Sequence, residues 1–345
     1  MIHRYQRMLG RSGIQTSALG MGCWAIGGPM HMKGTPLGWG KVNDEESKRA
    51  IRRAFEMGIN FFDTADMYGM GHSEKLIGEV LSGKRDQVVI ATKFGMTFND
   101  KEITGFEGSP EYIKRALEAS LKRLKTDYID LYQFHLGDFP LNQASKTREF
   151  LEEMVAKGKI KGYAWSTDNE ENASFFSEGQ NCIAVQHELN VFIGNEKILQ
   201  LCEDEDLASI NRGPLAMGIL TGKFGLDSSF PEDDCRNIVD LHNDPYYMFF
   251  KGGKPVPELL QKLNAIKEIL RSNGRTLAQG ALGWLWAKSD KTIPIPGFKT
   301  EKQVEENAGA MDFGPLNQAQ MLEIEEILFH SKENIKTTQL SIEKP

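Results

Sequence analysis

Residues 60–69 read NFFDTADMYG, residues 88–95 read VVIATKFG and residues 129–135 read IDLYQFH. Each stretch is a short run of apolar and β-branched residues that closes on a polar side chain: Asp63, Lys93 and His135. Runs of this kind are typical of buried strands, and amphipathic helical segments separate them. The alternation predicts βα units and a parallel sheet whose carboxyl ends share one edge.

Further runs of the same kind bring the number of predicted strands to eight. They lie at 17–22, 59–63, 88–93, 129–134, 160–165, 183–187, 207–211 and 292–296. Eight strands with interleaved helices could form a doubly wound sheet, but the count and the even spacing favour a closed (β/α)8 barrel. A chain of 345 residues is within the usual range for one barrel, so we expect an α/β fold with a single domain over 1–345.

The helix ends are readable in two places. Ser109 and Pro110 suit the N-cap and first turn of a helix over 110–125, whose apolar residues fall on one face. Acidic residues open a second helix at 44–57, and Gly58 suits a left-handed end to it.

Three segments lie outside the repeated βα pattern. The opening MLGRSGIQTSALGMGCW, residues 8–24, predicts a β-hairpin with its turn at 11–13, which could plug the bottom of the barrel. Residues 224–256 are polar and poorly periodic, and a loop this long in a compact domain is usually functional or mobile. The polar tail from about 332 to 345 is expected to be loosely held.

Composition excludes several classes of partner. The net charge is -7 and no basic stripe is present, which argues against nucleic acid. No apolar run approaches the ~18–20 residues that a membrane helix needs, and the first residues lack the apolar core of a signal peptide. The four cysteines are scattered, so neither a disulfide framework nor a metal site is expected, and a cytoplasmic location is the default.

One glycine-rich motif is a decoy. GMGCWA at 20–25 fits the G-x-G-x-x-A pattern of dinucleotide-binding turns. That pattern requires a helix directly after it, and the following GGPMHMKGTP cannot open one, so the motif predicts a strand-end loop instead.

Four polar groups at the ends of consecutive predicted strands indicate chemistry at the mouth of the barrel. These are Asp63, Lys93, His135 and Tyr68, which follows Asp63 by five residues. Reduction of a carbonyl needs a proton donor, and a tyrosine hydroxyl with a pKa of ~10 donates poorly unless an ammonium lowers its pKa. Lys93 could do this with Asp63 as its buried partner. A histidine could donate a hydrogen bond to the carbonyl oxygen as charge develops there. Each residue alone has an ordinary structural explanation, but their joint placement favours one catalytic site.

These blocks resemble the aldo-keto reductase superfamily. DTAxxY, ATKxG and DLYxxH match its Asp, Tyr, Lys and His tetrad, and the similarity extends from LGRSGIQTSALGMG to IPIPGFKTEKQVEEN. The resemblance implies a (β/α)8 barrel with an extra C-terminal helix and an NADPH-dependent reductase. It assigns Tyr68 as general acid, tuned by Asp63 and Lys93, with His135 orienting the carbonyl.

The resemblance also assigns residues to the nucleotide. Ser166 and Gln186 would bind the nicotinamide carboxamide, whereas Thr167 departs from the family's Asn. Arg212 stands where many relatives stack a tyrosine on the ring, and a guanidinium plane can stack there instead. GFKTEKQVEEN follows the last strand and opens a helix, which suits an anion such as the 2′-phosphate of NADP. The full set of expected cofactor residues is Ser166, Gln186, Arg212, Gly213, Pro214, Leu215, Gly218, Lys223, Arg236, Gly297, Lys299, Thr300, Gln303, Glu306 and Asn307.

The substrate is expected to be a small carbonyl compound in an apolar pocket. The residues predicted to line that pocket are Trp24, Met30, Trp39, Phe94, Phe139 and Trp165. Two other functions stay open at this point. The first is a nucleotide-binding regulatory subunit, like the potassium-channel β subunits that resemble this fold. The second is a barrel lyase or isomerase that uses Lys93 as a Schiff base, against which the block at 297–307 argues.

Overall fold

Eight parallel strands form the centre of the molecule. The computed structural model describes residues 5–237 and 248–329. The sheet has the order β16-β13-β12-β11-β10-β7-β6-β3. A bridge between Gly22 and Gly297, in which the Gly22 N–H donates to the Pro296 carbonyl at 3.0 Å, joins its two edges and closes the barrel. The predicted eight-stranded barrel is confirmed. Its strands are β3 (Gly20–Gly22), β6 (Phe61–Asp63), β7 (Val89–Phe94), β10 (Ile129–Phe134), β11 (Ile160–Ser166), β12 (Cys182–Glu188), β13 (Ala208–Arg212) and β16 (Thr292–Pro294).

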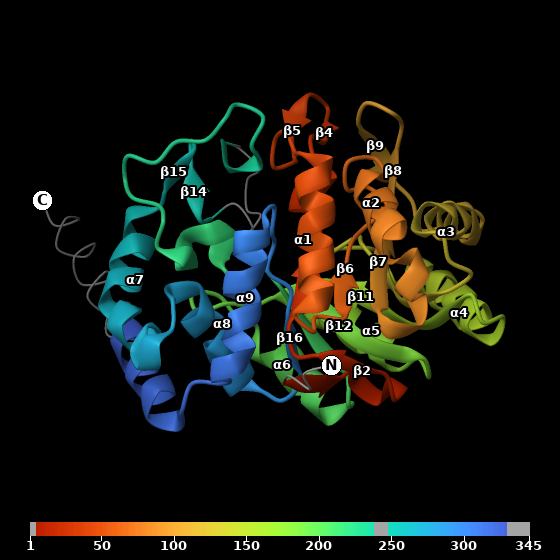
Figure 1. The fold of residues 1–345 in the computed structure, drawn as a ribbon. Helices are drawn as coiled ribbons and strands as arrows, with labels where there is room; N and C mark the ends of the chain where they lie inside the picture. Colours follow the sequence, from red (N-terminus) through yellow and green to blue (C-terminus); the bar gives the residue numbers. More distant parts are fainter. Residues whose placement is uncertain (1–4, 238–247, 330–345) are drawn as a thin grey trace, which may run out of the picture.

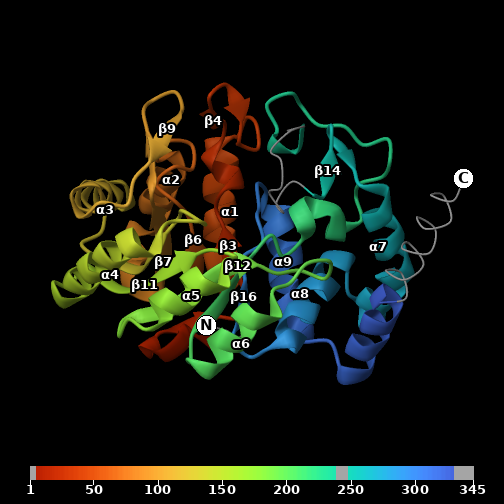
Figure 2. The ribbon, with the colours of Figure 1, turned by 180° about the vertical axis from the view of Figure 1, so that it is seen from behind.

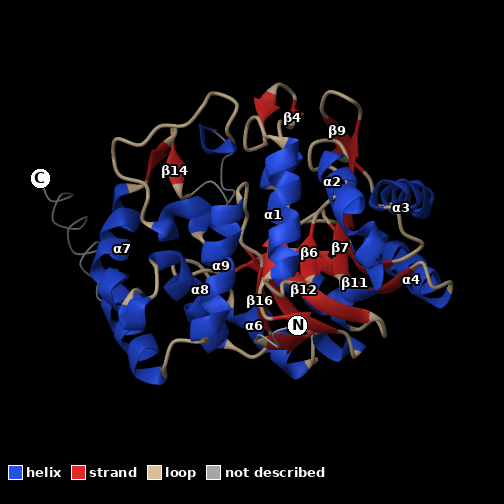
Figure 3. Cartoon of the chain, in the orientation of Figure 1, coloured by secondary structure: helices blue, strands red, loops and turns tan. Residues whose placement is uncertain are grey.

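Helices surround the barrel (Figure 3). The two helices whose ends were predicted from the sequence, α1 and α3, have the expected ends. Ser109 caps α3 by accepting a hydrogen bond from the Tyr112 N–H, and Gly58 takes a left-handed φ of 87° after α1. The helices are α1 (Asp44–Glu56), α2 (His72–Leu81), α3 (Pro110–Leu124), α4 (Leu141–Ala156), α5 (Glu170–Ser177), α6 (Glu196–Asp204), α7 (Pro257–Leu270), α8 (Leu277–Lys288) and α9 (Glu301–Phe313), followed by the predicted extra helix at 318–329.

The N-terminal hairpin closes the lower end of the barrel (Figures 1 and 2). Strands β1 (Gln6–Met8) and β2 (Gln15–Ser17) pair antiparallel, as predicted, around a turn at Gly10–Ser12. Leu9 packs with inward-facing apolar side chains from seven of the barrel strands. The Arg11 guanidinium donates to the carbonyls of Ser177, Gly179 and Cys182. These contacts tie the plug to the later half of the barrel.

A second, smaller sheet rises over the upper end, at the carboxyl ends of the barrel strands (Figures 1 and 2). Its order is β5-β4-β9-β8, formed by β4 (His31–Met32), β5 (Thr35–Pro36), β8 (Met96–Phe98) and β9 (Ile103–Phe106). It joins the loop after β3 to the loop after β7. The sequence did not predict this sheet, because strands of two to four residues carry no readable periodicity.

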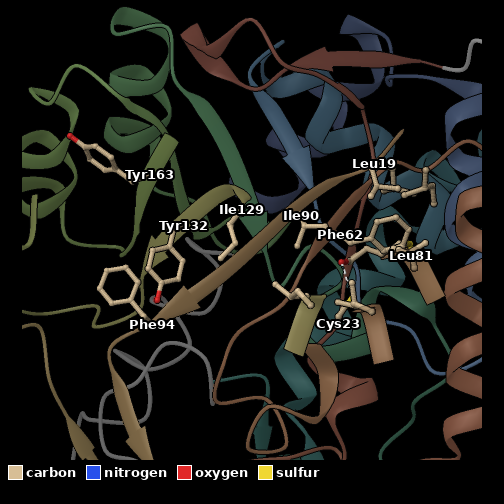
Figure 4. Packing of buried hydrophobic residues seen from close by; sticks show 14 of the residues in the cluster. Leu19, Cys23, Phe62, Leu81, Ile90, Phe94, Ile129, Tyr132 and Tyr163 are labelled. Atoms are coloured by element: carbon tan, nitrogen blue, oxygen red, sulfur yellow. Dashed lines mark hydrogen bonds between the residues drawn. The ribbon is translucent and has the colours of Figure 1, made fainter. Parts of the chain in front are cut away.

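The largest apolar core lies between the barrel and its helices. Phe94 and Tyr132 stack there with ring centroids 4.5 Å apart (Figure 4). Phe94 follows the inward-facing Lys93, and side chains alternate across a strand, so Phe94 faces the helices. Cys23, Cys182, Cys202 and Cys235 are all buried and none forms a disulfide.

The predicted loop at 224–256 contains a 3-10 turn at Cys235–Asn237 and a hairpin of β14 (Phe250–Lys251) and β15 (Lys254–Pro255). Residues 238–247 of this loop and the tail at 332–345 lie outside the described residues. Within the described ranges, the chain forms no helix of sufficient length and apolarity to span a bilayer.

Candidate active site

The four predicted catalytic side chains meet at the upper end of the barrel. The Lys93 ammonium lies 2.5 Å from Asp63 Oδ1, 2.8 Å from the Thr64 carbonyl and 3.4 Å from the Tyr68 hydroxyl. Asp63 is the last residue of β6, Lys93 is the last residue but one of β7, and His135 directly follows β10. Neighbouring strand ends therefore bring together residues that are far apart in the sequence. The rings of Tyr68 and His135 lie edge to face, with centroids 6.1 Å apart.

Two glutamines that complete the environment of Asp63 were not predicted in this role. The side-chain amides of Gln133 and Gln186 each donate to Asp63 Oδ2 at 2.8 Å, and Gln186 also donates to Gln133 Oε1 at 3.0 Å. Both carboxylate oxygens of Asp63 are thereby hydrogen-bonded, as a buried charge requires. Gln133 could have been identified from the sequence, because it is a polar residue inside the otherwise apolar end of the run IDLYQF.

Burial dominates the electrostatics of Tyr68. Burial raises the pKa of its hydroxyl above the usual 10, and the neighbouring Lys93 ammonium offsets only part of that rise. The expected net lowering of this pKa is therefore wrong for the protein alone. For Lys93, burial lowers the pKa, but Asp63 and Tyr68 outweigh it, so the net pKa lies above 10.5. The lysine thus stays protonated, and Tyr68 holds its proton at neutral pH.

His135 is held in its neutral form. Burial lowers its pKa well below 6.5, and the positive charges of Lys93 and Arg212 lower it further. Its Nδ1 is buried and has no hydrogen-bond partner among the residues that the structure describes. A neutral imidazole beside a tyrosine hydroxyl can still donate one hydrogen bond to a carbonyl oxygen.

A cavity of about 690 Å³ extends from these residues across the top of the barrel. Asp63, Tyr68 and His135 line it, whereas Lys93 is fully buried behind them. Of the expected cofactor residues, all except Thr300 line the same cavity: Ser166, Gln186, Arg212, Gly213, Pro214, Leu215, Gly218, Lys223, Arg236, Gly297, Lys299, Gln303, Glu306 and Asn307. The structure thus brings the catalytic and cofactor candidates to one elongated site.

The far end of the cavity is rich in cations. Lys223, Arg236 and Lys299 line it, together with Lys302, which the sequence reading missed. Burial lowers the pKa of Lys223 and of Lys299, because each ammonium is taken partly out of water. Arg236 pairs with Asp234 and lies 3.7 Å from the centroid of the Phe230 ring. Cations gathered in one cleft suit a phosphate-bearing ligand.

The start of α9 is already capped by its own side chains. The Thr300 hydroxyl accepts from the Gln303 N–H, and Gln303 Oε1 accepts from the N–H groups of Lys299 and Thr300, at 2.7 and 3.3 Å. Thr300, one of the expected cofactor residues, caps the helix and does not line the cavity. The Lys299 ammonium donates to the Trp39 carbonyl and stays at the cavity wall.

The loop after β13 is shaped for close approach of a ligand. Gly213, Ala216, Met217 and Gly218 all have positive φ values, between 48° and 98°. Arg212 itself forms ion pairs with Glu188, at 2.8 Å, and with Asp168. Neither carboxylate was singled out from the sequence. Thr167 turns away from the cavity, because its hydroxyl donates to the Gly137 carbonyl at 2.6 Å.

The opposite wall of the cavity is apolar. Trp24, Met30 and Trp39 line it as predicted, with further side chains that were not predicted: Met32, Leu37, Met67, Met96, Ile103 and Phe106. Tyr68 packs against this cluster, and its ring lies parallel to that of Trp24 at 6.1 Å. The prediction that Phe94, Phe139 and Trp165 line the pocket is wrong, since none of them borders it. Phe94 and Trp165 face the surrounding helices instead, and Phe139 packs on Phe134.

Comparisons with known proteins agree with this architecture. The family profile described as "Aldo/keto reductase family" matches residues 18–328. Aldo-keto reductase YhdN of Bacillus subtilis is 32% identical over 300 residues, 85% of each chain. Aldo-keto reductase yakc [NADP(+)] of Schizosaccharomyces pombe is 32% identical over 324 residues, 90% of this chain and 87% of the relative. A probable voltage-gated potassium channel subunit beta of Arabidopsis thaliana is 28% identical over 333 residues, 89% and 91% of the two chains. The solved glycerol dehydrogenase AKR11B4 of Gluconobacter oxydans superposes with a TM-score of 0.78 at 28% identity, over 96% of this chain and 97% of the other.

Proposed function

This chain belongs to the aldo/keto reductase family, whose members are NAD(P)H-dependent oxidoreductases, and we propose that it reduces aldehydes or ketones to alcohols with NADPH. The observation that carries the proposal is the contact of the Lys93 ammonium with both Asp63 and the Tyr68 hydroxyl, at the floor of a cavity with a cationic far end. The S. pombe relative, whose name includes NADP(+), supports the choice of nucleotide.

The residues at the cavity floor suit proton delivery to a carbonyl oxygen. NADPH supplies a hydride to the carbonyl carbon when it is bound. As that C–H bond forms and the carbonyl π bond breaks, the Tyr68 O–H bond breaks and its proton moves to the oxygen. Lys93, fixed by Asp63, stabilises the tyrosinate that remains until a proton returns to it from solvent. His135 donates a hydrogen bond to the same oxygen and orients the substrate.

The residues available for the nucleotide fit its chemistry. Ser166 and Gln186 would hold the carboxamide, and Arg212 would lie against the ring. The backbone of 213–218 and Lys223 would hold the pyrophosphate, and Lys299 the 2′-phosphate. Lys299 and Lys223 line the cavity and supply positive charge for the anionic groups of the nucleotide.

The apolar wall indicates which carbonyl compounds fit. Among the described residues, the segments at 24–37 and 96–106 contribute only uncharged side chains to the cavity. Burying a carboxylate or phosphate there would cost several kcal/mol. Methionine side chains adapt to ligands of different shape. We infer substrates with an uncharged aromatic or alkyl substituent.

A nucleotide-binding subunit without turnover is the second candidate, and the Arabidopsis relative, described as a channel subunit, motivates it. Tyr68→Phe separates the two. We expect this variant to bind NADPH as the parent does and to lose at least ~100-fold in turnover, the scale of general acid catalysis. Tyr128→Phe, just before the amino end of β10, is the matched control and should keep full turnover. Tight NADPH binding with no reduction of any carbonyl by the parent would favour the binding subunit.

A further inference from the structure

Two carboxylates hold Arg212, a cation that lines the same cavity as Tyr68 and His135. Arg212 Nη1 donates to Glu188 Oε2 at 2.8 Å, and Nη2 donates to Asp168 Oδ2. Arg212 ends β13, Glu188 ends β12, and Asp168 lies two residues after β11. The guanidinium borders the cavity that Tyr68 and His135 also line. Its side chain is therefore fixed from three neighbouring strand ends.

The carboxylates are themselves fixed. Asp168 Oδ1 accepts a hydrogen bond from the Glu188 N–H at 2.7 Å, and Glu188 Oε1 accepts one from Asn190 Nδ2 at 3.1 Å. Gly213 leaves room for this arrangement, because a Cβ there would lie 2.0 Å from Glu188 Oε1. A planar guanidinium held at two of its nitrogens keeps its face in one orientation.

The group carries one positive and two negative charges, a net charge of -1. A nicotinamide ring is neutral when reduced and positively charged when oxidised. An uncompensated guanidinium against that ring would weaken the binding of the oxidised nucleotide and leave the reduced one less affected.

We propose that Asp168 and Glu188 are positioning residues that hold the Arg212 guanidinium flat against the nicotinamide and offset its positive charge there. They thereby prevent that charge from weakening the binding of the oxidised nucleotide relative to the reduced one. This inference rests on the proposed function, because it requires the nicotinamide to lie beside Arg212.

The test compares the binding of NADP+ and NADPH to the parent and to Asp168→Asn. Both nucleotides would be titrated against the tryptophan fluorescence of the protein, for which Trp24 and Trp39 lie at the cavity. Asp168 is 31% exposed, so the isosteric variant should fold. We expect the dissociation constant for NADP+ to rise about tenfold more than that for NADPH. A tenfold change corresponds to about 30 mV in the potential of the bound couple. Glu188→Gln should change the ratio in the same direction.

Asp206→Asn is the matched control. Asp206 pairs with Lys291 just before the amino end of β13, away from Arg212, and its φ of 51° suits asparagine. This variant makes the same change in net charge and should leave the ratio unchanged. Equal weakening of both nucleotides by Asp168→Asn, or a shift of the same size in Asp206→Asn, would overturn the inference. Failure of the parent to bind either nucleotide would instead overturn the proposed function.

Discussion

The contributions of the buried Lys93–Asp63 ion pair to stability and to turnover can be measured separately. Lys93 is fully buried and Asp63 is 2% exposed, so Lys93→Met leaves a carboxylate in the interior without its cation. Breaking a buried ion pair from one side typically costs ~3–5 kcal/mol. Gln133 and Gln186 still donate to Asp63 Oδ2, so we expect a loss near the lower end of that range, about 3 kcal/mol in the free energy of unfolding.

The double variant Asp63→Asn/Lys93→Met removes both charges and leaves an oxygen for the two glutamines. We expect it to regain at least ~2 kcal/mol relative to the sum of the single losses, because neutral replacements of buried pairs are often well tolerated. Its turnover should nevertheless stay at the background level, since Tyr68 has lost its ammonium. Urea unfolding followed by circular dichroism measures the stabilities, and NADPH oxidation measures the turnover.

Lys161→Met provides the comparison. Its partner Asp130 is as buried as Asp63, but Lys161 is 47% exposed and Asp130 also pairs with Arg85. An exposed partner contributes little, so the expected loss is at most ~1 kcal/mol. Additive losses in the double variant, or a Lys93→Met loss no larger than that of Lys161→Met, would refute the reasoning.

Three further predictions concern cofactor choice, substrate choice and pH. Lys299→Ala should weaken NADPH at least ~10-fold more than NADH, as the loss of a charge-assisted contact would, and equal weakening would remove the role of Lys299 at the 2′-phosphate. The parent should prefer para-isopropylbenzaldehyde over the near-isosteric para-carboxybenzaldehyde by ~10-fold or more in kcat/KM. Phe106→Lys, at a side chain that is 59% exposed, adds a positive charge to the apolar wall and should reduce that preference. An unchanged ratio of the two kcat/KM values would contradict the role of this wall in substrate choice. Burial lowers the pKa of His187 to about 4, so the folded state keeps it neutral while the unfolded chain takes up a proton near pH 6.5. Its contribution to stability is therefore complete above pH 6.5 and is lost as the pH falls toward 4. From pH 7 to 4.5 the free energy of unfolding in urea should fall by about 2–3 kcal/mol more for the parent than for His187→Gln. Equal falls in the two proteins would contradict the expected destabilisation by His187 at low pH.

Strand ends were the part of the site that could be predicted from the sequence. Asp63, Lys93 and His135 each close an apolar run, and parallel strands deliver their carboxyl ends to one edge, so convergence follows from topology alone. Strand parity could also have been used further. Phe94 and Trp165 stand next to inward-facing residues and must therefore face outward, which the sequence reading overlooked.

Other features depend on distances that no local pattern contains. The pairing of Met32 with Ile103 builds the small sheet over the cavity from segments about 70 residues apart. Gln133 reaches Asp63 across β7, and Asp168 reaches Arg212 across β12, only because these strands pair in a particular register. The pKa of Tyr68 likewise depends on how completely the hydroxyl is buried, which the sequence does not specify.

The plug at the lower end of the barrel has a consequence for synthesis of the chain. The hairpin leaves the ribosome before the barrel strands, yet Arg11 bonds residues 177–182 and Gly10 lies against the backbone of Ala208. At about 5–20 residues per second, roughly 10–40 s pass before those partners emerge. Throughout that interval the barrel core against which Leu9 packs is incomplete. We expect the hairpin, although it is made before the barrel, to be among the last segments to dock, so that the nascent chain cannot close the lower end of the barrel until its second half has emerged.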